Sequence, residues 1–215
     1  MSYPADSQAL PERGPDEGVP THMSQPDFFG EPERFPTGFR YAEGLITARE
    51  EQSLIGEIEG LPFKEFEFHG FLGKRRVVSF GWRYDFNHGG LQKTVDIPDY
   101  PSPRSRACFA GLAAAELQQV LLTEYRPGAA IGWHKDRSVF GEVVGVSLLS
   151  ACTFRLRRKV SERWERMSLE LQPRSAYLLQ GPVRTGWEHS IPAVSRLRYS
   201  ITFRNIIIES GRRRR

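Results

Sequence analysis

Residues 198–204 read Arg198-Tyr199-Ser200-Ile201-Thr202-Phe203-Arg204, and this stretch alternates strictly between polar and apolar side chains. Successive side chains of a β-strand point to opposite faces of a sheet, so the alternation predicts a strand. Its apolar face is suited to a core and consists of Tyr199, Ile201 and Phe203. Its other face carries two guanidinium groups and two hydroxyl groups, those of Arg198, Ser200, Thr202 and Arg204.

The two arginines of this strand allow two interpretations. If their face points into a barrel, they need anionic partners, because an unpaired buried charge is costly. A small dicarboxylate would supply them, since arginine binds carboxylates through two parallel hydrogen bonds. Alternation alone is also compatible with an edge strand whose arginines are solvated.

Short β-prone runs separated by turn signals continue this pattern through the second half of the chain. Such closely spaced strands are typical of a sandwich or a jelly-roll barrel. The runs are 120–125, 143–149, 153–157, 167–171, 176–179 and 198–207. The fold class that we expect is therefore α+β, with helices first and a β-barrel core after them.

The helices are expected upstream of the barrel. Thr47 and Glu50 have the spacing of a capping box, and apolar residues at helical spacing follow them, which predicts an amphipathic helix over 48–60. Ser102 and Pro103 suit the start of a second helix within 103–118.

Composition divides the 215 residues into one domain with extensions. Residues 1–35 are rich in Pro, Gly, Asp, Glu and Ser, which predicts a disordered arm. We expect the helices and a substrate lid in 36–118, the barrel core in 119–208, and a basic tail in 209–215. The net charge of +4 permits a nucleic-acid partner without requiring one.

Targeting and redox signals point to the cytoplasm. The N-terminus lacks a basic segment followed by an apolar one, so no secretory signal is expected. No apolar run approaches the roughly 18 residues of a membrane span. Cys108 and Cys152 do not form a CxxC pair, which favours reduced thiols.

One histidine stands out from the other four because of its neighbours. His134 and Asp136 are two residues apart after a predicted strand and turn, so both side chains can point toward one metal ion of the first transition row. An HxD pair is common by chance, and a local hydrogen bond in a surface loop would explain it equally. With His189 as the third ligand, the set matches the two-histidine, one-carboxylate arrangement of non-haem Fe(II) oxygenases, although it also suits catalytic zinc.

These motifs together resemble those of the AlkB family of Fe(II)/2-oxoglutarate dioxygenases, which oxidatively dealkylate nucleic-acid bases. The resemblance covers roughly residues 70–208. It is carried, in chain order, by Leu122-Thr123-Glu124-Tyr125-Arg126-Pro127-Gly128, His134-Lys135-Asp136, His189 and residues 198–204.

The resemblance implies a double-stranded β-helix, which is a distorted jelly roll, with iron at its open end. His134, Asp136 and His189 would be the ligands, and O2 and 2-oxoglutarate the cosubstrates. It implies further that Arg198 pairs with the distal carboxylate of 2-oxoglutarate, that Arg204 lies near its other end, and that Tyr125 donates a hydrogen bond to it. Two more expected cosubstrate contacts, where the family often has asparagine, are Thr123 and Ser200.

The resemblance also bears on the substrate. Residues 74–86 interleave basic and aromatic side chains at the position of the family's substrate lid, where aromatic rings stack on an extruded base. Candidate substrate-binding residues are Trp82, Arg83 and Tyr84. A strand that packs these aromatics into the core is the alternative interpretation.

The function expected first is DNA or RNA repair by oxidative demethylation of alkylated bases, in nucleic acid that is single-stranded, without a membrane or a stable protein partner. A hydroxylase or demethylase of protein side chains or small molecules on the same fold is the second. A nucleic-acid-binding module with a vestigial site is the third.

Overall fold

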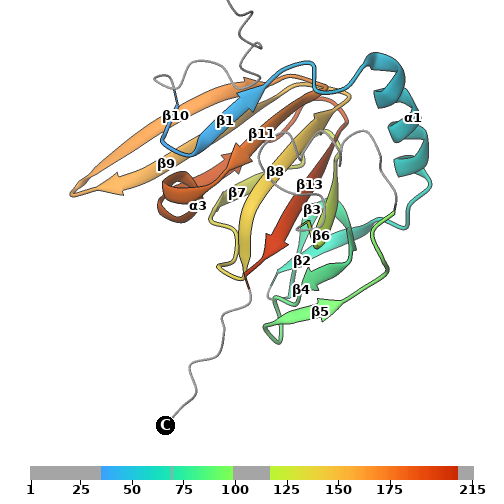
Figure 1. The fold of residues 1–215 in the computed structure, drawn as a ribbon, viewed down its shortest axis with the longest axis horizontal. Coiled ribbons are helices and arrows are strands. Elements are labelled where there is room, and N and C mark those ends of the chain that lie inside the picture. Colours follow the sequence, from blue (N-terminus) through green and yellow to red (C-terminus); the bar gives the residue numbers. More distant parts are fainter. Residues whose placement is uncertain (1–34, 69, 99–116, 208–215) are drawn as a thin grey trace, which may run out of the picture.

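The computed structural model describes residues 35–68, 70–98 and 117–207, and its strands form two antiparallel sheets with a small hairpin beside them (Figure 1). In spatial order, the larger sheet consists of β1 (Phe39–Ala42), β11 (Ser175–Leu179), β8 (Phe140–Leu148), β13 (Arg198–Ile206), β6 (Gln119–Tyr125), β3 (Phe71–Phe80) and β2 (Lys64–Phe68). The smaller sheet consists of β10 (Arg163–Leu171), β9 (Cys152–Val160), β12 (Glu188–Ile191) and β7 (Ile131–His134). The hairpin consists of β4 (Trp82–Tyr84) and β5 (Leu91–Lys93).

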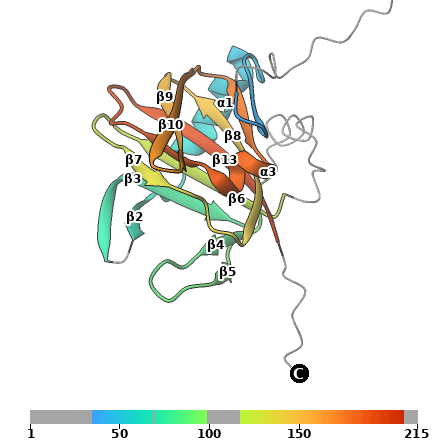
Figure 2. The same ribbon diagram turned by 90° about the vertical axis from the view of Figure 1, so that its left-hand side faces the viewer.

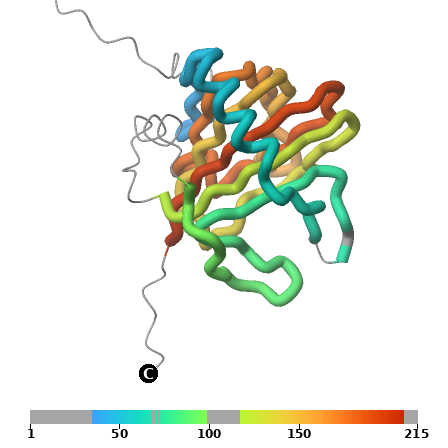
Figure 3. The backbone as a smooth tube through the Cα atoms, turned by 90° about the vertical axis from the view of Figure 1, so that its right-hand side faces the viewer, coloured from blue at the N-terminus to red at the C-terminus, as the bar shows by residue number. Residues whose placement is uncertain are grey.

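Two apolar clusters hold these layers together. One lies between the sheets and joins side chains of the smaller sheet, such as Phe154 and Leu156, to Val143 and Leu179 of the larger sheet. The other lies on the outer face of the larger sheet, under the helix α1 (Ala48–Glu59), which crosses that face in Figure 3. The strand-rich double sheet confirms the expected jelly-roll core.

The predicted helix over 48–60 is confirmed as α1. The Thr47 hydroxyl accepts a hydrogen bond from the Glu50 amide, and the Glu50 carboxylate accepts one from the Thr47 amide, which completes the capping box. Ile58 on the inner side of α1 is fully buried against the larger sheet. The helix therefore begins at its cap and is fixed by its apolar stripe.

The expectation of several N-terminal helices is wrong for the described part of 36–118. This part contains one helix, α1, and the five strands β1 to β5. Figure 2 shows β2 to β5 gathered at one side of the molecule, away from β9 and β10. Strand β2 was missed because a short edge strand rich in charged residues gives a weak strand signal. Strand β3 agrees in part with the alternative interpretation of residues 74–86 as a strand.

Other expectations fall on residues that are not described: almost all of the second helix within 103–118, the arm at 1–35 and the tail at 209–215. The remaining helix, α3 (Gly181–Gly186), precedes β12. Among the described helices, neither has the length and apolarity that crossing a membrane requires.

Strand β13 lies in the middle of the larger sheet and carries several of the predicted site residues. It pairs with β6 on one side and β8 on the other, so that Ser200 lies between Thr123 and Ser147. The side chains of Tyr199, Ile201 and Phe203 belong to the cluster under α1. The opposite, polar set of β13 therefore faces the space between the sheets, as the alternation predicts for a barrel strand.

Candidate active site

The structure brings together the three side chains predicted as metal ligands. His134 at the end of β7 and His189 on β12 are directly opposite each other in the smaller sheet, and their ring centroids are 4.2 Å apart. Asp136 follows β7, and its Oδ2 atom lies 3.7 Å from Nε2 of His189. Residues separated by more than fifty positions thus meet at the inner face of the smaller sheet.

The two imidazoles are suited to ligation. Nδ1 of His134 lies 2.8 Å from the carbonyl oxygen of Gly132, which can only accept a hydrogen bond, so this contact assigns the ring proton to Nδ1 and leaves the lone pair on Nε2. Burial lowers the pKa of His134 and lowers the pKa of His189 to about 3. Both rings are therefore neutral near pH 7, which is the form that binds metal.

Asp136 is held in its ionised form by the positive charges around it. Burial by itself raises the pKa of this carboxyl group, but the charge of Arg204, with a smaller contribution from Arg184, outweighs burial and lowers it. Nη2 of Arg204 donates a hydrogen bond of 2.8 Å to Oδ1 of Asp136. This contact connects β13 of the larger sheet to the end of β7.

A second arginine, which no sequence motif indicated, holds the backbone around Asp136. Arg184 on α3 is buried and donates hydrogen bonds to the carbonyl oxygens of Asp136, Arg137, Phe140 and Gly141. A buried guanidinium with four carbonyl acceptors needs no carboxylate partner. Arg184 therefore fixes the backbone of the segment that carries Asp136.

The chemistry of this set fits a metal ion, although its geometry is not yet that of a closed site. As it stands, no group of three or more His, Cys, Asp or Glu side chains in the described ranges is arranged so that it could hold a metal ion. However, Oδ2 of Asp136 is buried and has no hydrogen-bond partner. A buried carboxylate oxygen without a donor is unfavourable by itself, and a cation between it and the two imidazoles would remove that cost.

Arg198 provides the second unsatisfied group of the site. Its side chain is 1 % exposed, lies over the Tyr125 ring, and donates one hydrogen bond of 3.0 Å to the Ser147 hydroxyl. Its Nε and Nη1 atoms are buried without an acceptor, and no carboxylate within residues 35–68, 70–98 and 117–207 pairs with it. This cation is therefore arranged to receive an anion that is not part of the described protein.

The two hydroxyls predicted as cosubstrate contacts, Thr123 and Ser200, lie in one row with two further serines beside Arg198. Thr123, Ser200, Ser147 and Ser175 occupy paired positions on β6, β13, β8 and β11, and all four are buried. Their side chains share the inner face of the larger sheet with Tyr125 and Arg204. The predicted cosubstrate residues are thus assembled on one surface, opposite the histidines.

Tyr177 on β11 is a further inward residue that the sequence reasoning missed. Its phenol packs on the backbone of Gly145, where any larger residue would collide with it, and its ring lies 4.8 Å from that of Phe154. Burial, reinforced by the negative charge of Asp136, raises the pKa of Tyr177. It therefore remains a protonated donor inside the barrel. The alternation of β11 places it inward, but its strand partner Gly145 is evident only from the register.

The mouth of the site is bordered by a connected set of aromatic rings and guanidinium groups, which we call the rim cluster: Phe66, Arg75, Tyr84, Phe86 and Arg137. The Arg75 guanidinium lies 3.8 Å from the Phe66 ring centroid, and Phe66 meets Phe86 edge-on at 5.4 Å. Phe86 in turn contacts Tyr84, and the guanidinium of Arg137, the residue after Asp136, lies over both rings.

The three candidate substrate-binding residues do not all lie on the side of β4 that carries the rim cluster. Tyr84 belongs to the rim cluster, and Trp82 shares its face of β4. Arg83 points to the other face and donates two hydrogen bonds to the side chain of Gln92 on β5, so it lies apart from the cluster. Phe86 ends the stretch 74–86 that was predicted as the lid, whereas Phe66 and Arg137 come from separate segments and were not singled out by the sequence.

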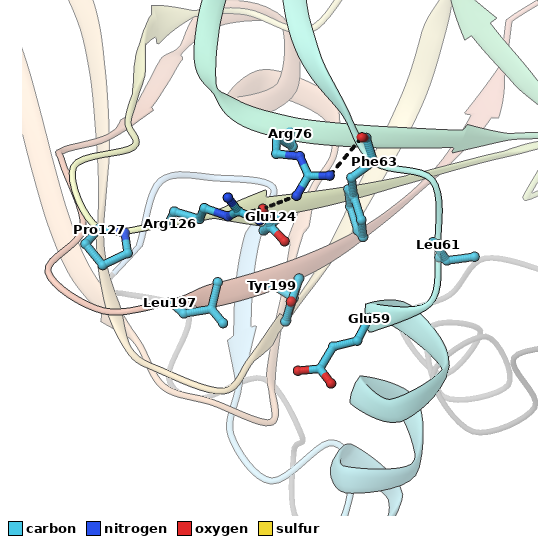
Figure 4. Close-up of a pocket in the computed structure, with 9 residues that line it drawn as sticks. All are labelled: Glu59, Leu61, Phe63, Arg76, Glu124, Arg126, Pro127, Leu197 and Tyr199. Carbon is cyan, nitrogen blue, oxygen red and sulfur yellow. Dashed lines mark hydrogen bonds and ion pairs between the residues drawn. The ribbon is translucent and has the colours of Figure 1, made fainter.

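A separate cavity of about 470 Å³ lies on the outer face of the larger sheet, near the end of α1 (Figure 4). Its charged groups neutralise each other, since Glu124 pairs with Arg76 at 3.0 Å and with Arg126 at 2.8 Å. The backbone of β6 and β13 separates it from the triad. We therefore place the chemistry in the barrel and not in this cavity.

Comparison with known proteins shows the family of the chain. The family model described as 2OG-Fe(II) oxygenase superfamily matches residues 38–204. The chain belongs to this superfamily. Its cofactor is therefore Fe(II), and its cosubstrates are 2-oxoglutarate and O2.

Two curated relatives and two solved structures are similar to the chain. It is 26% identical over 174 residues to the "Alkylated DNA repair protein ALKBH8 homolog" of Arabidopsis thaliana (69% of this chain, 49% of that protein). It is 31% identical over 104 residues to the "Uncharacterized protein L905" of Acanthamoeba polyphaga mimivirus (42% of this chain, 49% of that protein). The chain spans about half the length of both relatives.

The structural neighbours share the fold at low identity. The structure of OsALKBH1 has a TM-score of 0.61 and 14% identity (80% of this chain, 98% of that chain). A Pseudomonas putida prolyl-4-hydroxylase has a TM-score of 0.55 and 13% identity (79% of this chain, 93% of that chain). These superfamily neighbours support the jelly-roll core but do not define a substrate.

Proposed function

We propose that this dioxygenase removes methyl groups from alkylated bases in single-stranded nucleic acid, with His134, Asp136 and His189 as its iron ligands. The observation that carries the proposal is the rim cluster beside this triad. Its aromatic rings would stack on an extruded base, and its guanidinium groups would donate hydrogen bonds to a phosphate or to the edge of the base. A curated relative named for alkylated DNA repair supports the same assignment.

The cosubstrate is assigned to the inner face of the larger sheet. Arg198 would receive the distal carboxylate of 2-oxoglutarate, because this guanidinium is buried with two unused nitrogens. Tyr125, Thr123 and Ser200 line the path from Arg198 toward the histidines and would donate hydrogen bonds to the cosubstrate. Arg204 would hold Asp136 in place through the bond to Oδ1, leaving Oδ2 for the metal.

Bound iron supplies the redox chemistry that couples reduction of O2 to decarboxylation of 2-oxoglutarate and hydroxylation of a substrate C–H bond. In the balanced reaction, one oxygen atom enters succinate as CO2 is lost, and the other enters the N-methyl group. The resulting N–CH2OH group breaks its C–N bond to release formaldehyde. The hydroxyl proton passes to the nitrogen if that nitrogen carried a proton before methylation, and it is released to water if the methylated base was a cation. The protein's part is to hold the methyl group over the triad, to keep it there by stacking in the rim cluster, and to exclude water.

The proposal is tested by measuring succinate and formaldehyde together. The enzyme is incubated with Fe(II), 2-oxoglutarate and O2, with a singly methylated single-stranded oligonucleotide or with the same sequence unmethylated. We expect equal amounts of succinate and formaldehyde above background with the methylated strand only, and neither product with His189→Ala. Succinate that no oligonucleotide changes would contradict the proposal and direct attention to protein or small-molecule substrates. A protein that binds iron and never forms succinate would instead fit the vestigial binding module.

A further inference from the structure

Arg75 is the member of the rim cluster that lies on β3, the strand beside β6. On β3, Val77 pairs with Thr123 and Arg76 pairs with Glu124, so the same register carries Arg75 to the level of Tyr125. Arg75 and Val77 share one face of β3, which is the inner face that also carries Thr123. The Arg76 side chain points the other way, to Glu124 and Phe63 on the outer face.

The charge of Arg75 acts on the reacting centre. Burial lowers the pKa of Arg75, and the charges of Arg204 and Asp136 are close enough to act on it as well. A group placed over the triad therefore lies within the field of this guanidinium.

No carboxylate in the described ranges neutralises the guanidinium groups of the rim. Arg75 and Arg137 form no ion pair with the described residues and contact only aromatic rings. The two acidic side chains near the hairpin are engaged elsewhere, since Asp85 accepts hydrogen bonds from Asn87, His88 and Gln92, and Glu67 accepts one from Asn87. Asp136 is already opposed by Arg204.

Methylated bases fall into two classes, cationic and neutral, which an unpaired guanidinium at the mouth of the site would distinguish. Methylation of a ring nitrogen that had a lone pair makes a cation, as in 1-methyladenine and 3-methylcytosine. Methylation of a ring nitrogen that carried a proton leaves the base neutral and keeps carbonyl oxygens beside the methyl group, as in 3-methylthymine and 1-methylguanine. A guanidinium repels the first class and donates hydrogen bonds to the carbonyl oxygens of the second.

We propose that the substrate of this site is a neutral N-methylated base with a carbonyl oxygen next to the methylated nitrogen, and that Arg75 determines this specificity. The inference rests on the proposed function and narrows it to one substrate class. If Arg75 only packed on Phe66, the substrate preference of the enzyme would not depend on the charge of the base.

The test compares four single-stranded oligonucleotides of one sequence that carry 3-methylthymine, 1-methylguanine, 1-methyladenine or 3-methylcytosine. The value of kcat/KM for each is obtained from demethylated product by mass spectrometry. We expect the two neutral bases to exceed the two cationic bases in kcat/KM by about 10- to 100-fold, which is the range for like charges about 6–12 Å apart at an effective dielectric constant of about 20. Cationic bases turned over as well as or better than neutral ones would overturn the inference and leave the dealkylase intact. No product from any of the four would overturn the dealkylase itself.

Variants at Arg75 separate charge from packing. Arg75→Gln keeps a hydrogen-bond donor without the charge and should reduce the preference to less than about threefold, while Arg75→Glu should reverse it. Arg49→Gln, an exposed position on α1, is the matched control and should keep the wild-type preference. Substrate-free succinate formation and circular dichroism establish that each variant is folded. A folded Arg75→Glu enzyme with an unchanged preference would overturn the role of Arg75.

Discussion

Arg76 and Arg198 belong to the same sheet but to its two opposite faces, and they differ in how their charges are satisfied. On the outer face, Arg76 pairs with Glu124 at 3.0 Å and donates to the Phe63 carbonyl oxygen at 2.9 Å. On the inner face, Arg198 is more deeply buried and has only the Ser147 hydroxyl as an acceptor. The charge and the hydrogen-bond donors of Arg76 are satisfied within the fold, whereas those of Arg198 would be satisfied only by a ligand.

This contrast shows how function can be located without a bound molecule. Unpaired buried charge costs several kcal/mol, so it persists where something outside the fold compensates for it. In the described part of the chain, the buried side-chain atoms without partners belong to Asp136, Arg198 and Arg204, and all of them line the barrel interior. Inner-face changes should therefore alter activity, and outer-face changes should alter stability at most.

The largest effect is expected from Asp136→Ala. This change removes one proposed ligand and leaves Arg204 without its carboxylate, so succinate formation should fall more than about 100-fold, beyond the loss typical for a partner of a ligand. Glu165→Gln, which alters an exposed ion pair on β10, serves as the control. If the Asp136→Ala variant kept a tenth of the wild-type rate with iron still bound, the expectation that inner-face residues determine activity would be wrong.

A smaller effect is expected from Arg204→Gln. Asp136 would lose the hydrogen bond of 2.8 Å that orients it, so Fe(II) affinity should fall about 10- to 100-fold, with partial rescue at high Fe(II). Competition with a chelator measures this affinity. An unchanged affinity would mean that Arg204 has no part in holding the carboxylate.

On the outer face, Arg76→Gln should lower the free energy of unfolding by about 1–2 kcal/mol and leave kcat unchanged. Glu124 is 6% exposed and would keep only Arg126, whose side chain is largely solvated. Urea denaturation gives the stability, and the succinate assay gives the activity. Lost turnover in a folded variant would show that this face also participates in catalysis.

The smallest effect is expected from Arg158→Ala on β9. Its ion pair with Glu165 is exposed at both ends, so the free energy of unfolding should change by less than about 1 kcal/mol. Thermal unfolding at low and high salt is sufficient to measure it. A larger loss would mean that paired surface arginines contribute more to this fold than their exposure indicates.

The parts of this account that the sequence could predict are those with local signals. The alternation of residues 198–204 and the capping box at Thr47 depend on nearest neighbours, and both are confirmed. The HxD spacing and His189 indicated a ligand set, and the structure places these three side chains together, although their role stays a prediction. The family motifs indicated the cosubstrate residues in the same way.

The parts that were missed depend on long-range register. Tyr177 is set against Gly145 by the pairing of β11 with β8, and Arg75 is set beside Tyr125 by the pairing of β3 with β6. Arg184 reaches the segment around Asp136 from a helix some fifty residues away. No local pattern records these pairings, because a shift of one residue in register would turn each side chain to the other face.

The most direct test of the central claim compares the binding of 2-oxoglutarate and pyruvate to the Fe(II)-loaded protein by calorimetry without oxygen. Both are 2-oxo acids, but pyruvate lacks the distal carboxylate that we assign to Arg198. We predict that the wild-type protein binds 2-oxoglutarate more than about 100-fold more tightly than pyruvate, since two charge-assisted hydrogen bonds are at stake. Arg198→Met should bind the two with nearly equal affinity. A wild-type protein that does not distinguish them, or a folded Arg198→Met protein that still does, would contradict the account.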